Sequence, residues 1–223
     1  MNLKEELFKN EDLKYRDWIG INAKELPRIG VRVPIIKNIA KEIIKNKEFD
    51  ILKEESTYFE EELTKTFVIA MRKHNSFDEI KNDLEFWISH INSWDLNDTL
   101  CQHMKDVKKY KKEVFDYLEK YINSNKEFEV RVCVVMYLCY FLDDEYIDKV
   151  LSNILKFKND EFYAKMGIAW CIATAFAKVP DKTLEWFKTC DLDEWTYNKS
   201  IQKACESFRV DENLKKILKS LKK

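Results

Sequence analysis

A repeating pattern of helix-like segments limits what this chain can fold into more than any other feature of its sequence. From residue 59 onward the chain divides into segments of roughly 30 to 35 residues, each with an apolar stretch, a polar break and a second, more amphipathic stretch. Such a pattern is typical of antiparallel helix pairs that stack on one another. We expect the first helices of these pairs to begin near Phe59, Trp94, Phe128, Phe162 and Trp195, and the second helices near Phe77, Lys111, Glu145, Asp181 and Asn213.

The scarcity of turn residues supports the same fold class. With 3 Gly and 3 Pro in 223 residues, the sequence lacks the turns of a β-rich fold, and it contains no Gly, Pro or Ser run long enough for a linker. We therefore predict an all-α fold in a single domain over residues 1–223. Segments 130–142 and 166–179 are apolar on nearly all sides and should form the inner layer. Helix caps are expected at Ser76, at Ser93 and at Asp143 with Asp144.

The segment before residue 59 is less regular. We expect short helices over residues 2–10 and 15–21, followed by an extended stretch over residues 26–34, where two prolines and a glycine disfavour helix. A further helix should run from Pro34 to about Asn46. Two acidic runs, Glu54 to Glu55 and Glu60 to Glu62, are interpreted as solvated residues or as charges at a helix N-terminus.

Charge, cysteines and hydropathy exclude several classes of protein. The formal charge of −1 provides no bulk attraction to nucleic acid or to an anionic membrane, so any such affinity must come from local patches. The 6 cysteines form no CxxC pair and fall mostly on apolar helix faces, which predicts reduced thiols and a cytoplasmic protein. No run of 18 apolar residues and no signal-peptide core occurs, so we expect neither export nor a membrane span.

No metal or cofactor is expected from the sequence. The three histidines, His74, His90 and His103, have no metal-ligand spacing with one another or with a cysteine. The chain also has no glycine-rich loop of the kind that cradles phosphates.

Several stretches spread over nearly the whole chain resemble one family. They are residues 30–34 (GVRVP) with Lys37 and residues 39–43 (IAKEI), then residues 93–98 (SWDLND), 128–131 (FEVR), 164–170 (AKMGIAW) and 196–199 (TYNK). In these stretches the sequence resembles the AlkD-like family of DNA alkylation repair proteins, helical-repeat relatives of alkylpurine DNA glycosylases. The resemblance implies a right-handed α-α superhelix of HEAT-like helix pairs with a concave groove. It also implies a monomer that binds double-stranded DNA and hydrolyses the N-glycosidic bond of N3- or N7-alkylated purines.

The resemblance implies four catalytic positions, Trp94, Asp98, Arg131 and Trp170. Trp94 and Asp98 are four residues apart, so on a helix they project from one face. A carboxylate there would stabilise the oxocarbenium-like sugar that forms as an alkylated base leaves, and no strong general acid is needed because that base departs uncharged. The two indoles would hold the nucleotide, and Arg131 would bind a backbone phosphate.

Each of these residues also has a structural interpretation. Both tryptophans could be core residues, because large aromatic side chains usually fill helix interfaces. Asp98 could be a solvated helix residue, and Arg131 an ion-paired structural arginine.

A set of cations is predicted to contact DNA: Arg131, Arg32, Lys37, Lys41, Lys165 and Lys199. Charges that recur every four residues, at Lys24, Arg28 and Arg32 and again at Lys37, Lys41 and Lys45, suggest basic stripes. Ordinary solvated faces would give the same pattern. If the cations line a groove, each phosphate that they neutralise would steepen the salt dependence of binding.

Two departures from the family pattern favour an alternative function. In glycosylase relatives two substantial helices before the position of Pro34 help to grip DNA, whereas the extended stretch here leaves room for less. Those relatives also carry an Arg-Glu step after the second indole, where this chain has Ile172, Ala173 and Thr174. The alternative is a non-catalytic HEAT-like module that binds a DNA structure or a protein. A third hypothesis is a scaffold protein without any nucleic acid partner.

Overall fold

The computed structural model describes residues 2–19 and 26–223, and within these ranges it contains helices, turns and loops but no strand. The all-α prediction is therefore confirmed. The α-helices are α1 (Leu3–Phe8), α2 (Leu13–Ile19), α3 (Val33–Asn46), α4 (Phe59–Met71), α5 (Phe77–Ile88), α6 (Trp94–His103), α7 (Lys111–Leu118), α8 (Glu127–Tyr140), α9 (Ile147–Ile154), α10 (Phe162–Lys178), α11 (Pro180–Thr189), α12 (Glu194–Glu206) and α13 (Glu212–Ser220). Short 3-10 helices are η1 (Phe49–Lys53), η2 (Lys105–Lys109) and η3 (Glu119–Tyr121).

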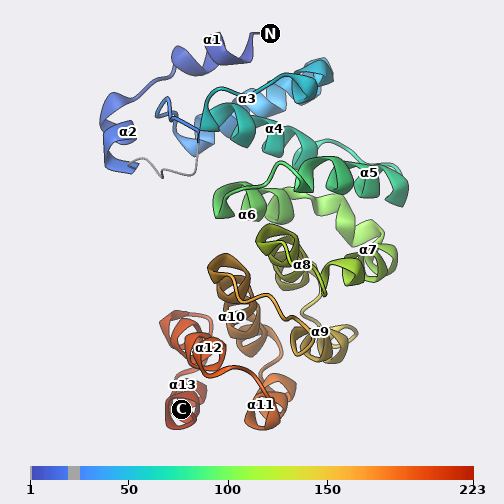
Figure 1. Cartoon of the computed structure of the whole chain (residues 1–223), viewed down its shortest axis with the longest axis vertical. Coiled ribbons are helices and arrows are strands. Elements are labelled where there is room, and N and C mark those ends of the chain that lie inside the picture. Colours follow the sequence, from blue (N-terminus) through green and yellow to red (C-terminus); the bar gives the residue numbers. More distant parts are fainter. Residues whose placement is uncertain (1, 20–25) are drawn as a thin grey trace. The chain divides into compact units, whose positions relative to one another are not determined.

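The chain divides into two compact units. Unit 1 spans Met1–Asp106 and contains α1 to α6, and unit 2 spans Val107–Lys223 and contains α7 to α13 (Figure 1). Each unit has its own packed helices. The single domain, the right-handed superhelix and the concave groove stay predictions.

The predicted helix starts agree closely with the structure. Five helices, α4 to α7 and α10, begin at the predicted residue, and the other five begin within two residues of it. Ser76 caps α5 as expected, because its Oγ accepts a hydrogen bond from the Glu79 N–H. Ser93 is the N-cap residue of α6, as predicted, but its side chain is buried and makes no capping hydrogen bond. The second short helix was expected to reach residue 21, which lies outside the described residues.

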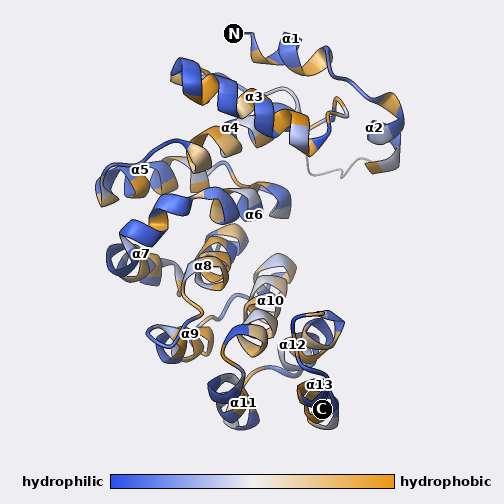
Figure 2. Ribbon diagram, turned by 180° about the vertical axis from the view of Figure 1, so that it is seen from behind, coloured by the Kyte–Doolittle hydropathy of each residue, from blue (hydrophilic) through white to orange (hydrophobic). Residues whose placement is uncertain are grey.

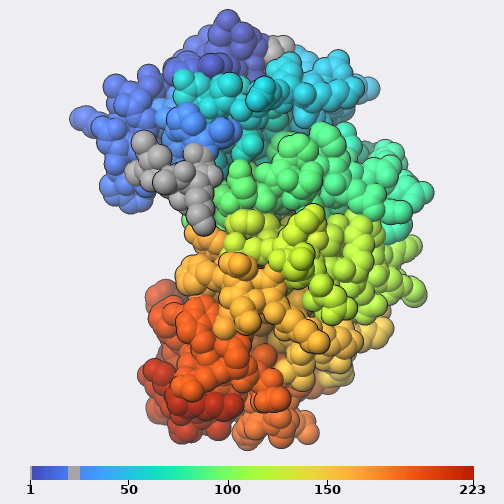
Figure 3. Space-filling view, viewed as in Figure 1, coloured from blue at the N-terminus to red at the C-terminus, as the bar shows by residue number. Residues whose placement is uncertain are grey.

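Unit 2 is organised around an inner layer of three helices. Helix α10 packs against α8 on one side and α12 on the other, while α9 packs against α11. Helices α8 and α10 have buried side chains around most of their circumference, as the sequence predicts. Figure 2 shows the difference in composition, with α10 mainly pale or orange and α11 largely blue. In the space-filling view the helices of unit 2 follow one another as bands from green to red (Figure 3).

Unit 1 is built around α4, which packs against α1, α3 and α6. The stretch before α3 forms no helix, as predicted, and its backbone is held by one carboxylate of α4. The N–H groups of Ile29, Gly30 and Val31 donate to the Glu60 carboxylate at 2.9, 2.8 and 3.3 Å. Glu60 is only 2% exposed, so its interpretation as a solvated charge is wrong. An extended backbone has no helical acceptors for its N–H groups, and Glu60 supplies them.

Glu61, which follows Glu60, is also buried but acts at the helix terminus. Its Oε2 accepts hydrogen bonds from the backbone N–H groups of Thr57 and Tyr58, both at 2.9 Å, and so satisfies two backbone donors at the start of α4. The interpretation as helix N-terminal charge therefore holds for Glu61.

Gly30 occupies a position that a side chain cannot enter. Its φ is +95°, and a Cβ there would lie 2.6 Å from the Asp12 carbonyl oxygen and 2.7 Å from the Arg16 Cβ. We expect Gly30→Ala to lower the free energy of unfolding by about 2 kcal/mol or more, since both backbone strain and a clash oppose the methyl group. Urea denaturation measures the change.

Gly167→Ala in α10 is the matched control for that substitution. A Cβ at Gly167 would lie 3.5 Å from the Arg131 Cγ, which is an ordinary contact. Because alanine favours helix over glycine, this variant should gain about 0.5 to 1 kcal/mol. A Gly30→Ala protein as stable as the wild type would contradict our account of the extended segment.

The cysteines of the chain differ in their burial. All six thiols are free, and Cys101, Cys133 and Cys171 are buried. Burial raises the pKa of the Cys133 thiol to about 12, so this thiol stays protonated at neutral pH. Among the described residues, none of the helices has the length and apolar composition needed to cross a membrane.

Candidate active site

Trp94 and Asp98 lie on one face of α6 in unit 1. Trp94 is the first residue of the helix and is 48% exposed, so the interpretation of this indole as a core residue is wrong. Asp98, one turn further along, is 8% exposed, so it is not a solvated surface charge either. The face therefore presents an open indole beside a mostly covered carboxylate.

Neighbouring polar groups fix the carboxylates of α6. The buried Asn97 side chain donates from Nδ2 to Asp98 Oδ1 at 3.1 Å. Asp95 accepts from the Arg28 guanidinium at 3.4 Å, and that guanidinium in turn lies 3.9 Å from the centroid of the Phe59 ring. Arg28 therefore holds Asp95, while Asn97 orients the carboxylate next to the exposed indole.

Lys37, a predicted DNA contact, joins α3 to α6 through His103. Its Nζ lies 3.0 Å from His103 Nε2, and His103 Nδ1 lies 3.0 Å from the Thr99 carbonyl oxygen. The carbonyl can only accept, so Nδ1 carries the proton and Nε2 accepts from the ammonium. Burial lowers the pKa of His103, and the charges of Lys37 and Lys105 lower it further. The imidazole is therefore neutral at pH 7.

The lowered pKa of His103 makes a testable contribution to stability. The unfolded chain takes up a proton near the ordinary pKa of 6.5, while the folded protein takes it up only at lower pH. Stability from this residue is therefore complete above pH 6.5 and is lost as the pH falls from there toward the folded-state pKa. In His103→Gln this loss should be absent, so its stability relative to the wild type should improve between about pH 8 and about pH 5.5 in urea titrations. A difference that does not change with pH would contradict the assignment.

Arg131 and Trp170 lie in unit 2, on α8 and α10. Arg131 is 5% exposed, and its Nη1 donates to the Tyr163 carbonyl oxygen at 2.8 Å. The Arg131 side chain also lies beside Gly167. Trp170 is half-buried and follows Gly167 by three residues, so it faces the same side of α10. Arg131 therefore ties α8 to α10 close to the second predicted indole.

The other predicted DNA contacts have partners within their own units. Arg32 pairs with Asp12 at 2.9 Å, and Lys41 donates to the Asn38 amide oxygen at 3.4 Å. In unit 2, Lys165 pairs with Asp193 at 2.8 Å and Lys199 donates to Gln202 at 2.7 Å. Lys24, part of one predicted basic stripe, lies outside the described residues.

The structure groups the predicted residues in two sets. Trp94, Asp98 and Lys37 belong to unit 1, and Arg131, Trp170, Lys165 and Lys199 belong to unit 2. Two residues that sequence reasoning missed stand beside them. His103 meets Lys37, and the Trp195 ring has both Lys165 and Lys199 over it, at 5.2 and 5.6 Å. The four-residue spacing of Trp195 and Lys199 was a signal for the second of these, whereas nothing in the sequence links His103 to Lys37.

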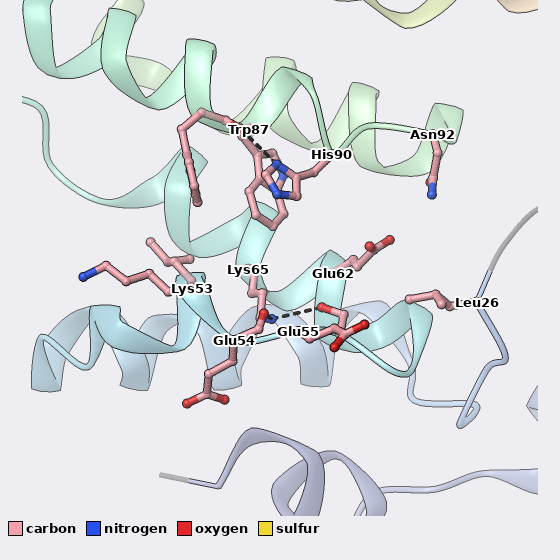
Figure 4. Close-up of a pocket in the computed structure, with 12 residues that line it drawn as sticks. Leu26, Lys53, Glu54, Glu55, Glu62, Lys65, Trp87, His90 and Asn92 are labelled. Carbon is pink, nitrogen blue, oxygen red and sulfur yellow. Dashed lines mark hydrogen bonds between the residues drawn. The ribbon is translucent and has the colours of Figure 1, made fainter.

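A separate pocket of about 530 Å³ lies in unit 1 and contains none of the predicted site residues (Figure 4). Trp87 and His90 of the α5 region stack on one side, with ring centroids 4.9 Å apart. On the opposite side the buried Lys65 ammonium donates to the Glu54 carbonyl oxygen at 2.7 Å and to Ser56 Oγ at 3.0 Å. Burial lowers the pKa of Lys65, and these two bonds hold its ammonium against the chain segment after η1. Lys65 therefore has a structural role in fixing this segment.

The described residues contain no group of three or more His, Cys, Asp or Glu side chains that could hold a metal ion. In a comparison with protein families, the family model described as DNA alkylation repair enzyme matches residues 4–208 of the chain. A search of curated proteins found no similar sequence.

Proposed function

Since the chain belongs to the DNA alkylation repair enzyme family, we propose that it hydrolyses the N-glycosidic bond of N3- or N7-alkylated purines in duplex DNA. The proposal rests above all on α6, where an exposed indole, Trp94, precedes a nearly buried carboxylate, Asp98, by one helical turn. A flat apolar surface beside a fixed negative charge suits a nucleotide whose sugar becomes cationic. We also propose that the protein is a monomer and lies in the cytoplasm.

Asp98 has the central role in this reaction. As the glycosidic bond breaks, its electron pair moves to the alkylated base, which leaves neutral, and the positive charge passes to the sugar. The Asp98 carboxylate stabilises that charge, and a water oxygen then bonds to the sugar carbon and loses a proton to the carboxylate or to solvent. Burial strengthens the interaction, because the carboxylate lies where the effective dielectric is lower than in water. The hydrogen bond from Asn97 keeps the carboxylate in one orientation.

The remaining candidates would bind the DNA. Trp94 and Trp170 would contact the nucleotide through their ring faces, and Arg131 would contact a backbone phosphate. Lys37 and Lys165 would add phosphate contacts, each from an ammonium that a neighbouring side chain already positions.

Release of 7-methylguanine from methylated duplex DNA tests the proposal. The wild type should release the base and Asp98→Asn should release it far more slowly, whereas Asp95→Asn on the same helix should stay within a few-fold of the wild type. Asp95 is the matched control because it pairs with Arg28 rather than being the carboxylate one turn beyond Trp94. No release by the wild type would overturn the enzymatic proposal.

A second candidate is a non-catalytic module that binds a DNA structure or a protein. Specific observations favour it: Lys165 and Arg32 are neutralised by Asp193 and Asp12, and Arg131 is 5% exposed. The two ion pairs reduce the positive charge that Lys165 and Arg32 can offer to a phosphate, and the burial of Arg131 reduces its access to one. This candidate predicts binding without base release, so the same assay combined with a duplex-binding titration separates the two.

A further inference from the structure

A row of aromatic rings crosses the inner layer of unit 2. Phe128 and Tyr163 stack with centroids 5.7 Å apart, Tyr163 meets Phe162 at 5.3 Å, and Phe162 meets Trp195 at 6.1 Å. Each of these four residues, here called the aromatic row, is the first or second residue of its helix. The row therefore runs across the N-terminal ends of α8, α10 and α12, which lie next to one another.

Two members of the row are open to solvent. Phe162 is 57% exposed and Trp195 is 38% exposed, although the two rings touch. Large apolar side chains that are exposed side by side are a common feature of binding sites. A pocket of about 500 Å³ lies beside Trp195 and is lined by Glu194, Trp195, Asn198, Lys199, Gln202 and Lys222.

Cations accompany the aromatic row. The Arg131 guanidinium lies 5.9 Å from the Tyr163 ring centroid, and the ammonium groups of Lys165 and Lys199 lie over Trp195. The two lysines over Trp195 differ in whether a carboxylate pairs with them. Asp193 neutralises Lys165, but Lys199 donates to the uncharged amide of Gln202. Lys165 also lies 4.0 Å from Asp160, so its charge is largely compensated. Among the charged side chains that line the pocket, two are lysines, Lys199 and Lys222, and one is an acid, Glu194, so the pocket lining has one positive charge in excess.

We propose that the aromatic row binds unpaired nucleotides of single-stranded DNA. Bases would stack on Phe162 and Trp195, and the phosphates between them would contact Lys199 and Lys222. Exposed rings interleaved with cations match a ligand that alternates flat bases with negative charges. Intact duplex DNA does not match as well, because its base faces are covered by their neighbours. The proposal does not depend on the carboxylate chemistry of Asp98.

Fluorescence anisotropy with the full-length protein and a labelled oligothymidylate of about twelve nucleotides tests the proposal. Trp195→Ala should weaken binding about tenfold, the loss typical of one stacked base. Trp195→Phe should retain more affinity than Trp195→Ala, because a ring remains. Lys199→Gln should weaken binding and reduce its salt dependence. Phe208→Ala, which removes a fully exposed ring from the same unit, is the control and should change the affinity less than twofold.

Three results would overturn the proposal. They are unchanged binding by Trp195→Ala, equal losses in Trp195→Ala and Phe208→Ala, and equally tight binding of an acidic peptide of the same net charge. Thermal melts of each variant show whether a loss of binding comes from unfolding. The oligothymidylate carries no alkylated purine, so its binding does not depend on base release. The protein can bind it without releasing a base from methylated duplex DNA, and can release the base without binding it.

Discussion

Replacing Asp98 by asparagine is expected to lower the rate of 7-methylguanine release by roughly a thousandfold. A carboxylate about 4 Å from a cation, at a dielectric intermediate between water and dry protein, contributes on the order of 4 kcal/mol before desolvation costs. Asparagine has nearly the same shape but no charge, so this stabilisation disappears while the packing of α6 remains. Single-turnover kinetics on duplex DNA with one 7-methylguanine measure the change.

The kinetic pattern matters as much as the size of the effect. The charge on the sugar develops mainly in the transition state, so Asp98→Asn should reduce kcat with little change in KM. Trp94→Ala, which removes a contact present in both states, should raise KM. If Asp98→Asn instead raised KM at an unchanged kcat, the carboxylate would be a binding residue and the proposed mechanism would be wrong.

Replacing Glu60 by alanine is expected to lower the free energy of unfolding by about 3 kcal/mol or more. Three backbone N–H groups, those of Ile29, Gly30 and Val31, donate to this one buried carboxylate. Without it they would be left buried and unsatisfied, and each such group costs about 1 to 3 kcal/mol. Urea denaturation measures the loss.

Two further variants sharpen that experiment. Glu60→Gln keeps one acceptor oxygen and should fall between the wild type and Glu60→Ala. Glu55→Ala, which removes an exposed carboxylate, should stay within about 0.5 kcal/mol of the wild type. Equal effects of Glu60→Ala and Glu55→Ala would show that Glu60 has no special role in holding the extended segment.

Most of the helices could be predicted because their signals are local. The apolar period and the polar breaks place the starts of α4, α5 and α10 at the observed residues, and Pro34 marks the start of α3. The hydrogen-bond partners of the Ser93 and Glu60 side chains could not be predicted from such local signals. Whether a polar side chain turns outward to cap a helix or inward to serve a distant segment depends on partners that only the packed fold supplies.

In the candidate site too, local features could be predicted from the sequence and contacts between helices could not. The four-residue spacing placed Trp94 and Asp98 on one helix face, and the structure agrees. It could not decide how far each side chain is exposed, and taken alone a tryptophan is more often core. The contacts of Lys37 with His103 and of Lys165 with Trp195 join different helices, so no local pattern contains them. Such pairs appear only once the helices are packed.

The hydrogen bond between Lys37 and His103 affects the entropy that is lost when a phosphate binds at α3. A lysine side chain in water samples many rotamers, and ordering it costs up to about 2 kcal/mol in entropy. For Lys37 folding has already restricted this motion, since a neutral imidazole accepts from its ammonium. An anion that binds there would lose less freedom on association than one that orders the exposed Lys41 one turn away.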